Sequence, residues 1–213
     1  EVLMCLSPIW TEKHETARRL AQRIKIVLDV AKSKGFRSGE NPVTAIKDAQ
    51  VLPKVKVKVK HHKAMAWRDV PAFYADLKGR SAISAKALRF TCLTGSRTGE
   101  VLGMRWEELD FYAGIWTCPE IRMKNGEDHR VPLTNEMLEI IEPLKAMQSE
   151  FVFEGQKRHA PLSNMSMLML LRRMGIEGVT VHGFRSTFRV WASEAIGADR
   201  EVAEMSLSHT IGN

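Results

Sequence analysis

The sequence predicts a mainly α-helical protein with a small antiparallel β-hairpin or sheet, an α+β fold. Apolar residues recur with the helical period over most of the 213 residues. Residues 114–134 differ, because they are rich in residues that favour strands and contain Asn125-Gly126, a strong hairpin signal. A hydrophobic fraction of 44% and a charged fraction of 27% are typical of a globular protein that buries a core.

The first third of the chain is predicted to hold one long helix, over residues 11–35. Thr11 or Thr16 can cap its start, and Gly35 can end it. A turn is expected around Pro42, which biases the residue before it away from helical geometry. One apolar stripe follows the helical period: Leu20, Ile24, Val27, Leu28 and Ala31.

A basic segment separates two predicted domains. Lys and Val alternate within residues 52–63, so this segment forms either a short strand with one basic face or an extended linker along phosphates. It has too few apolar residues for a core element, and we therefore place the boundary between residues 1–62 and 63–213. Further helices are expected at 67–79, 81–95, 135–147, 163–175, 181–197 and 199–209.

The net charge of +7 is concentrated in the first domain. Residues 1–62 hold 13 Lys and Arg against 6 Asp and Glu, whereas residues 63–213 hold 19 of each kind. This asymmetry predicts a polyanionic partner, with nucleic acid as the first candidate. A solvated basic helix face is the alternative explanation.

Several classes of protein are excluded by what the sequence lacks. No apolar run approaches the roughly 20 residues of a membrane span, and the start does not resemble a signal peptide. The three cysteines, Cys5, Cys92 and Cys118, have neither metal-site nor disulfide spacing, so we expect a cytoplasmic protein without a metal or other cofactor. Since the chain begins with Glu1 rather than Met, we expect it to be a fragment or a processed product.

Three polar clusters are candidates for chemistry, "TGSRTGE", "HGFRSTF" and "LSHT". In "TGSRTGE", Gly95 and Gly99 flank Arg97, so the backbone can approach a ligand closely while the arginine holds a phosphate. His182 and Arg185 in "HGFRSTF" would share one face of a helix. The alternatives are an ordinary turn-to-helix junction and a surface His–Arg pair.

Two further residues complete the candidate set. His209 follows the last predicted helix, where a capping or packed histidine is the alternative. Lys124 lies beside the Asn125-Gly126 turn, where a lysine is usually solvated but can also reach a neighbouring groove and donate a proton. No phosphate-binding glycine loop, zinc motif or carboxylate cluster competes with these residues. Phosphoryl chemistry without a metal requires cations from the protein, and this set would supply them.

The order of these residues resembles the tyrosine recombinase family, and within it the integrases of prophages and genomic islands. Arg97 matches its arginine box, Lys124 its hairpin lysine, "HGFR" with His182 and Arg185 its third signature, and "LSH" with His209 its last. The resemblance extends over nearly the whole chain, through segments such as "TARRLAQRI" and "HRVPLT". It is specific because the motifs occur together and in order.

The resemblance implies a role for each residue. Arg97 and Arg185 would hold the scissile phosphate, and Lys124 would protonate the 5′-oxygen that leaves. His182 would assist proton transfer at the nucleophile, and His209 would hydrogen-bond the phosphate. Glu100 would support the site rather than act on DNA. The family's reaction forms a covalent 3′-phosphotyrosine, which conserves the bond energy and needs neither ATP nor metal.

One departure concerns the nucleophile. The family's tyrosine follows the last box by roughly ten residues, in the covalent role known for tyrosine. The tyrosines of this chain, Tyr74 and Tyr112, lie elsewhere, so we nominate neither and expect the nucleophile beyond Asn213. The resemblance thus describes an integrase truncated at both ends and inactive alone. The alternatives are an inactive DNA-binding remnant and a related strand-transfer enzyme, such as a transposon recombinase or a type IB topoisomerase.

The resemblance also gives the basic first domain a role. Residues 1–62 would form part of a helical core-binding domain and a linker, and residues 63–213 the catalytic domain, closing around double-stranded DNA. The family acts as a homotetramer on attachment sites, with accessory DNA-bending proteins as possible partners and no membrane, which places it at the bacterial nucleoid. The DNA-binding candidates are Arg18, Arg19, Lys56, Lys58 and Lys60.

Overall fold

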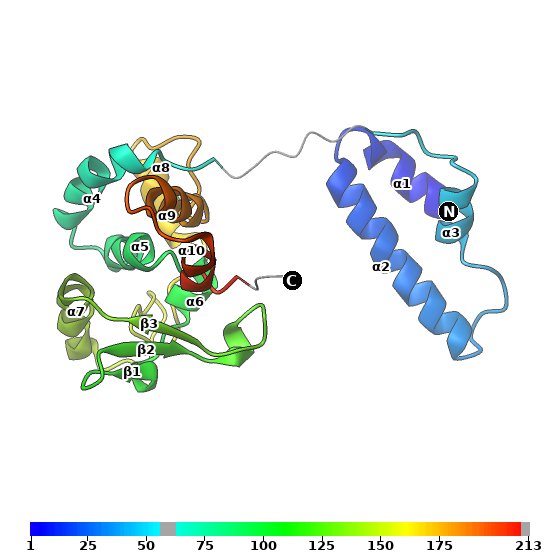
Figure 1. Cartoon of the computed structure of the whole chain (residues 1–213). Helices are drawn as coiled ribbons and strands as arrows, with labels where there is room; N and C mark the ends of the chain where they lie inside the picture. Colours follow the sequence, from blue (N-terminus) through cyan, green and yellow to red (C-terminus); the bar gives the residue numbers. More distant parts are fainter. Residues whose placement is uncertain (56–62, 210–213) are drawn as a thin grey trace. The chain divides into compact units, whose positions relative to one another are not determined.

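The computed structural model describes residues 1–55 and 63–209 (Figure 1). The chain divides into two compact units, Glu1–Lys60 and His61–Asn213, and each unit is described by itself. Most of the predicted basic strand or linker, with the candidates Lys56, Lys58 and Lys60, lies outside the described residues. None of the described helices is both long and apolar enough to cross a membrane.

The described residues of the first unit form three helices, whereas one long helix was predicted. They are α1 (Val2–Trp10), α2 (His14–Ser33) and α3 (Pro42–Asp48). Ala17 and Ala21 are the buried residues of α2, and their small side chains let it pack closely against α1, where Leu6 is buried. The apolar stripe predicted for this helix is confirmed only in part. Leu20 and Ile24 are half-buried, as predicted, but Val27 is 66% exposed.

The ends of these helices follow local sequence signals. Neither Thr11 nor Thr16 caps α2, because Lys13 occupies the N-cap position and Thr16 lies inside the helix. Gly35 follows the last turn with a φ of +74°, as predicted, since glycine adopts this left-handed conformation readily. The predicted turn at Pro42 is instead a helix start: Asn41 caps α3, and its Oδ1 accepts the Val43 amide at 3.0 Å.

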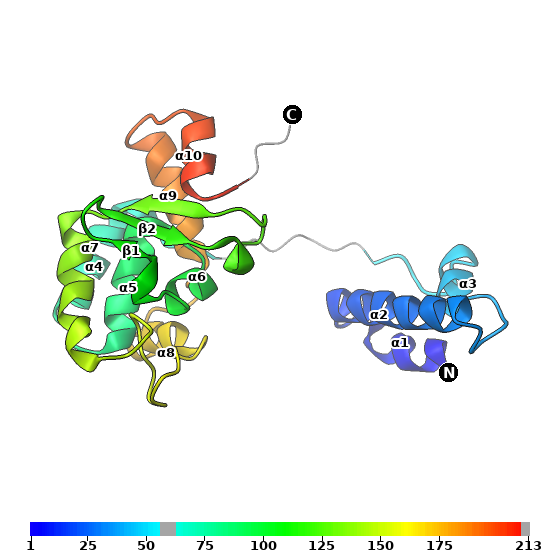
Figure 2. The same cartoon turned by 90° about the horizontal axis from the view of Figure 1, so that it is seen from below.

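The second unit is built around α5 (Ile83–Thr94), whose buried positions occur on nearly every side. Figure 1 shows the sheet below this helix and α4, α8 and α9 above it, and Figure 2 views the unit from the sheet side. The other helices are α4 (Val70–Lys78), α6 (Thr98–Leu102), α7 (Asn135–Ile141), α8 (Ser166–Arg173), α9 (Gly183–Glu194) and α10 (Arg200–Ser206). Short 3₁₀ turns are η1 (Trp67–Asp69), η2 (Trp106–Glu108), η3 (Glu120–Arg122) and η4 (Glu142–Met147).

Aromatic side chains of α5, the sheet and α9 form the centre of the core. The ring centroid of Phe90 lies 5.7 Å from that of Trp116 and 5.7 Å from that of Phe153, both in edge-on geometry. Phe184 stacks on Phe73 at 5.3 Å, which joins α9 to α4. The predicted mainly α fold with a small antiparallel sheet is confirmed.

The sheet has three antiparallel strands in the order β1-β2-β3. They are β1 (Leu109–Asp110), β2 (Ile115–Cys118) and β3 (His129–Pro132). The predicted strand residues therefore form strands, and β1 is a third strand that the hairpin signal did not indicate.

The connection between β2 and β3 is longer than a two-residue hairpin. The last paired residues are Cys118 and His129, so residues 119–128 form the loop. Asn125-Gly126 does lie in a turn, in which the Gly126 amide donates to the carbonyl of Met123 at 3.3 Å. Lys124 is therefore carried by an exposed loop rather than by the tip of a tight hairpin.

Gly95, which ends α5, offers a test of the packing between α5 and α10. Its φ is +62°, and a Cβ there would lie 2.7 Å from Cδ2 of Leu207, which is buried. Gly114 is the matched control, because its φ is +65° but its surroundings are open. Gly114→Ala should lower the free energy of unfolding by about 1–2 kcal/mol through the backbone alone. Gly95→Ala should cost a further 1–3 kcal/mol, roughly, through crowding. Urea denaturation measures both, and equal losses would contradict the packing described.

Candidate active site

Arg97 is fixed at the start of α6 by a buried carboxylate. It occupies the N-cap position, and Glu100 Oε2 accepts its backbone amide at 2.7 Å. Glu100 Oε1 accepts from Arg97 Nη1 at 2.6 Å. The Glu100 side chain is 2% exposed and that of Arg97 is 23% exposed. The carboxylate therefore lies behind the guanidinium, which keeps part of its surface open.

Arg185 projects from α9 and joins the ends of two other helices. Its Nη1 donates to the carbonyl of Gly95 at 2.6 Å, and its Nη2 donates to the carbonyl of Leu207 at 2.5 Å. The residue is 4% exposed. Burial and the positive charge of Arg97 lower the pKa of Arg185 to about 10. The two guanidinium groups are thus close enough to repel each other, although Arg185 stays charged near neutral pH.

His209 completes this group from the segment that follows α10. Its Nε2 lies 3.0 Å from Nη2 of Arg185, and its Nδ1 lies 2.5 Å from Oε2 of Glu204. Arginine nitrogens only donate, so Nε2 accepts and the proton of the neutral ring is on Nδ1. The other oxygen of Glu204 accepts from Nε of Arg189 at 2.5 Å. Four of the predicted residues, Arg97, Glu100, Arg185 and His209, are therefore connected directly or by charge.

Lys124 and His182 are placed differently from these four. His182 precedes α9 at its N-cap position and is exposed, and its carbonyl accepts the amide of Arg185 at 3.1 Å. His182 has helical dihedrals, with φ −64° and ψ −27°, and so lies one turn before Arg185 as the spacing predicts, but the two side chains differ in burial, since Arg185 is 4% exposed. Among the described residues, no hydrogen bond or ion pair joins the side chain of Lys124 to the other predicted residues.

Buried contacts nevertheless fix the base of the Lys124 loop. Arg122 donates from Nη2 to Oε2 of Glu108 at 2.5 Å and from Nη1 to the carbonyl of Gly103. The Glu108 side chain is 8% exposed and also accepts from the indole of Trp116 at 3.0 Å. The start of the loop is therefore attached to the sheet and to the end of α6.

His129 is a site neighbour that the sequence reasoning missed. It begins β3, where buried or half-buried positions alternate with exposed ones, and its side chain hydrogen-bonds to the backbone of Ser206. Burial lowers the pKa of His129; the negative charge of Glu100 raises it, and the positive charge of Arg185 lowers it. These effects place the ring near the arginine site. Strand alternation counted from Val131 was the signal that could have indicated an inward-facing His129.

The two tyrosines have other surroundings. The hydroxyl of Tyr74 donates to Glu136 at 3.0 Å and lies 3.4 Å from Nε of Arg89. Burial raises the pKa of Tyr74 to about 12, so its phenol holds its proton tightly. Tyr112 is fully exposed in the turn between β1 and β2. Neither position is suited to a nucleophile, as expected from the sequence.

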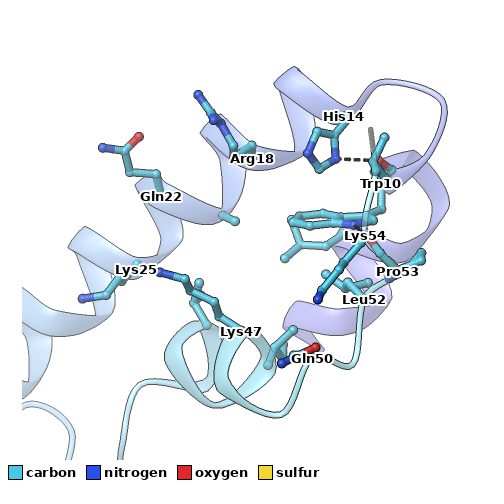
Figure 3. A pocket seen from close by; sticks show the side chains of 15 residues that line it. Trp10, His14, Arg18, Gln22, Lys25, Lys47, Gln50, Leu52, Pro53 and Lys54 are labelled. Carbon is cyan, nitrogen blue, oxygen red and sulfur yellow. Dashed lines mark hydrogen bonds between the residues drawn. The ribbon is translucent and has the colours of Figure 1, made fainter. Parts of the chain in front are cut away.

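The first unit has a groove with a basic rim (Figure 3). Arg18 lines it and pairs with Glu15 at 3.5 Å, and Arg19 pairs with the same carboxylate at 2.9 Å. The groove has a volume of about 730 Å³. Its other basic residues are Lys25, Lys47 and Lys54, and its apolar residues include Leu6, Trp10, Val43, Ile46 and Leu52. No Asp or Glu is among the described residues that line it, so the local charge is positive.

Family comparison identifies the chain. The phage integrase family matches residues 63–212, and the phage integrase central domain matches residues 1–49. The chain belongs to the phage integrase family. The resemblance inferred from the ordered motifs is thus confirmed. Among the described residues, no group of three or more His, Cys, Asp and Glu side chains is arranged to hold a metal ion.

Individual relatives of this integrase-family chain are prophage and phage integrases. Prophage integrase IntA of Escherichia coli K12 is 32% identical over 205 residues, which cover 93% of this chain and 48% of the relative. The integrase of Enterobacteria phage P4 is 28% identical, with 94% of this chain and 49% of the relative covered. The chain therefore spans about half the length of these relatives.

Solved structures share the fold. A lambda integrase dimer bound to a COC′ core site has a TM-score of 0.68 at 19% identity, covering 94% of this chain and 58% of that one. The Tn1549 transposon integrase in complex with circular intermediate DNA has a TM-score of 0.63 at 14% identity, covering 92% and 72%.

The repulsion between Arg97 and Arg185 predicts an oxyanion site. Orthovanadate bound between them would relieve it and stabilise the folded chain by about 1.4 kcal/mol at ten times its Kd. This corresponds to a rise in Tm of about 3–6 °C for a protein of this size. Arg97→Gln should abolish the rise, while Arg130→Gln, at an exposed position of β3, should keep it. Thermal unfolding at fixed ionic strength measures the effect, and an unchanged rise in Arg97→Gln would contradict the site.

The pairing of Glu204 predicts a loss of stability in acid. The hydrogen bond from His209, followed by the one from Arg189, lowers the pKa of Glu204 below 4.5. A carboxyl with a depressed folded-state pKa stabilises the protein above its unfolded pKa, and this contribution disappears as the pH falls through the folded value. Glu204→Gln should flatten the fall in unfolding free energy between about pH 5 and about pH 3. Urea denaturation over this range, with the exposed Glu201→Gln as control, tests the assignment. A fall as steep as in the unsubstituted chain would refute it.

Proposed function

We propose that this chain is the DNA-binding and catalytic part of a site-specific recombinase that integrates a prophage or genomic island. Its reaction would cut and rejoin double-stranded DNA through a covalent 3′-phosphotyrosine, without metal or ATP. The observation that carries the proposal is the pair of Arg97 and Arg185, with the His209 ring beside Arg185 and the buried Glu100 behind Arg97, in a chain of the phage integrase family.

The arrangement suits phosphoryl transfer. Arg97 and Arg185 supply positive charge to the non-bridging oxygens, whose negative charge grows in the transition state. Arg185 is anchored by two backbone carbonyls, so its orientation is set before the substrate binds. Preorganised donors of this kind cost no reorganisation at the moment of reaction. His209 adds a ring nitrogen beside Arg185.

The proposed reaction exchanges one phosphoester for another. A tyrosine hydroxyl attacks the scissile phosphorus and loses its proton with the help of His182. The bond from phosphorus to the 5′-oxygen breaks, and Lys124 gives that oxygen a proton. The 5′-hydroxyl of a partner strand later reverses these steps and releases the tyrosine. We propose that residues following Asn213 supply the tyrosine.

In this proposal the two units have different roles. Residues 1–62 form part of a core-binding domain with its basic linker, and residues 63–213 form the catalytic domain. The groove cations, with Arg18 among them, offer contacts to phosphates, which position a protein on DNA without reading its sequence. Arg19, Lys56, Lys58 and Lys60 are proposed for the same role.

The assembly on DNA is proposed by analogy with relatives. Structures of lambda integrase include a dimer on a core site and a tetramer on a Holliday junction. We propose a homotetramer on attachment sites for the complete protein, in the bacterial cytoplasm at the nucleoid, with accessory DNA-bending proteins as further partners.

The test uses the full-length product of the gene and nicked duplexes tiled over the DNA that flanks it. Nicked substrates trap the covalent complex, so a protein–DNA adduct that resists detergent is expected on at least one duplex. Arg97→Gln and Arg185→Gln should each reduce its rate of formation by about 10²–10³. Arg158→Gln, at an exposed loop position, is the control and should change it little.

The other outcomes discriminate between the alternatives. Binding to duplexes without any adduct would overturn the proposal in favour of a DNA-binding remnant. Relaxation of supercoiled plasmids that lack an attachment site would favour a topoisomerase.

A further inference from the structure

Glu204 contacts both the ring and the backbone of His209. Its carboxylate accepts the Nδ1 proton of the ring at 2.5 Å, and its carbonyl accepts the His209 amide at 2.9 Å. Between them, Ser208 has a φ of +52°, which turns the chain back toward the end of α10. This left-handed residue is unusual for a non-glycine and is maintained by contacts on either side.

The carboxylate of Glu204 is itself held in place. Its second oxygen accepts from Nε of Arg189 at 2.5 Å, and its side chain is 17% exposed. Arg189 lies one turn after Arg185 on α9, so the same helix supplies the cation that holds Glu204 and the cation that meets the far side of the His209 ring. Both nitrogens of the His209 ring are thereby held by hydrogen bonds.

We infer that Glu204 is a positioning residue that sets the tautomer and orientation of His209, and that Arg189 holds Glu204 in the conformation this requires. With Nδ1 committed to Glu204, Nε2 is the nitrogen that faces Arg185. The inference rests on the proposed function, in which Arg185 contacts the scissile phosphate.

This placement determines how His209 meets a phosphate. Phosphate oxygens accept hydrogen bonds, so Nε2 contributes one only when it carries a proton. Since Nδ1 keeps its proton toward Glu204, the ring is then an imidazolium, and the carboxylate balances its charge. The ionisable groups that face this pair are Arg185 and Arg189 from α9, and His129 from β3 at the backbone of Ser206.

The experiment measures the His209 tautomer directly. Long-range ¹H–¹⁵N spectra of the 213-residue chain, assigned with His209→Gln, should show the Nδ1–H form. Glu204→Ala should move the ring toward the Nε2–H form, whereas Glu204→Gln should keep Nδ1–H, because its amide oxygen still accepts. Glu201→Ala, at an exposed position of α10, is the control and should match the unsubstituted chain. An unchanged Nδ1–H tautomer in a folded Glu204→Ala variant would overturn the inference.

A second readout concerns charge rather than tautomer. Orthovanadate binding should weaken about tenfold in Glu204→Gln, as is typical when a residue that supports a ligand-binding side chain is changed. Binding as tight as in the unsubstituted chain would mean that the carboxylate charge does not act through His209.

The two proposals fail in different ways. If the full-length protein forms no covalent adduct while the tautomer responds as expected, the recombinase assignment fails and the positioning role stands. If the adduct forms and the His209 tautomer is unchanged in Glu204→Ala, only the positioning role fails and the recombinase assignment stands.

Discussion

The buried guanidinium of Arg185 is the contact on which the geometry of the site depends. A cation that is 4% exposed is costly unless its donors are satisfied, and here two backbone carbonyls and a histidine nitrogen satisfy them. The carbonyls belong to Gly95, at the end of α5, and Leu207, just after α10. One side chain therefore joins three helices, and a change in any of their ends would move it.

The glycine at the end of α5 follows from this arrangement. Gly95 has to direct its carbonyl at Arg185 while Leu207 and Phe188 lie against its α-carbon. A left-handed conformation without a side chain meets both demands. The local motif that precedes Arg97 thus serves the packing of α5 against α9 and α10 as well as the position of the arginine.

The sequence predicted the long helix α2, most helices of the second unit and several residues of the site, but it missed α1 and α3 and did not indicate how the site residues are connected. Helical periodicity is a local property, so α5, α8 and α9 could be read from their own segments. The loop between Cys118 and His129 depends instead on Arg122 reaching Glu108 and Gly103, which are distant in sequence. A two-residue hairpin rule does not include such contacts.

Site neighbours were missed for a similar reason. His129 lies at the site because β3 passes beside Ser206, and nothing within "DHRVP" itself indicates the contact between His129 and Ser206. The spacing of His182 and Arg185 predicted residues one helical turn apart, but not that Arg185 is buried while His182 is exposed. Glu204 precedes His209 by only five residues, yet its role depends on the positive φ of Ser208.

The carboxylates of the site illustrate how a protein can orient the groups that would meet a phosphate without covering them. Glu100 is almost fully buried whereas Arg97 is 23% exposed, and Glu204 is 17% exposed whereas His209 is 39% exposed. In both pairs the acid lies deeper than the group it holds. A carboxylate in front of these groups would repel a phosphate, while one behind them fixes their direction and leaves the positive end accessible. Burial, and after it the positive charge of Arg97, lowers the pKa of Arg185, and an incoming phosphate would relieve the repulsion between the two arginines.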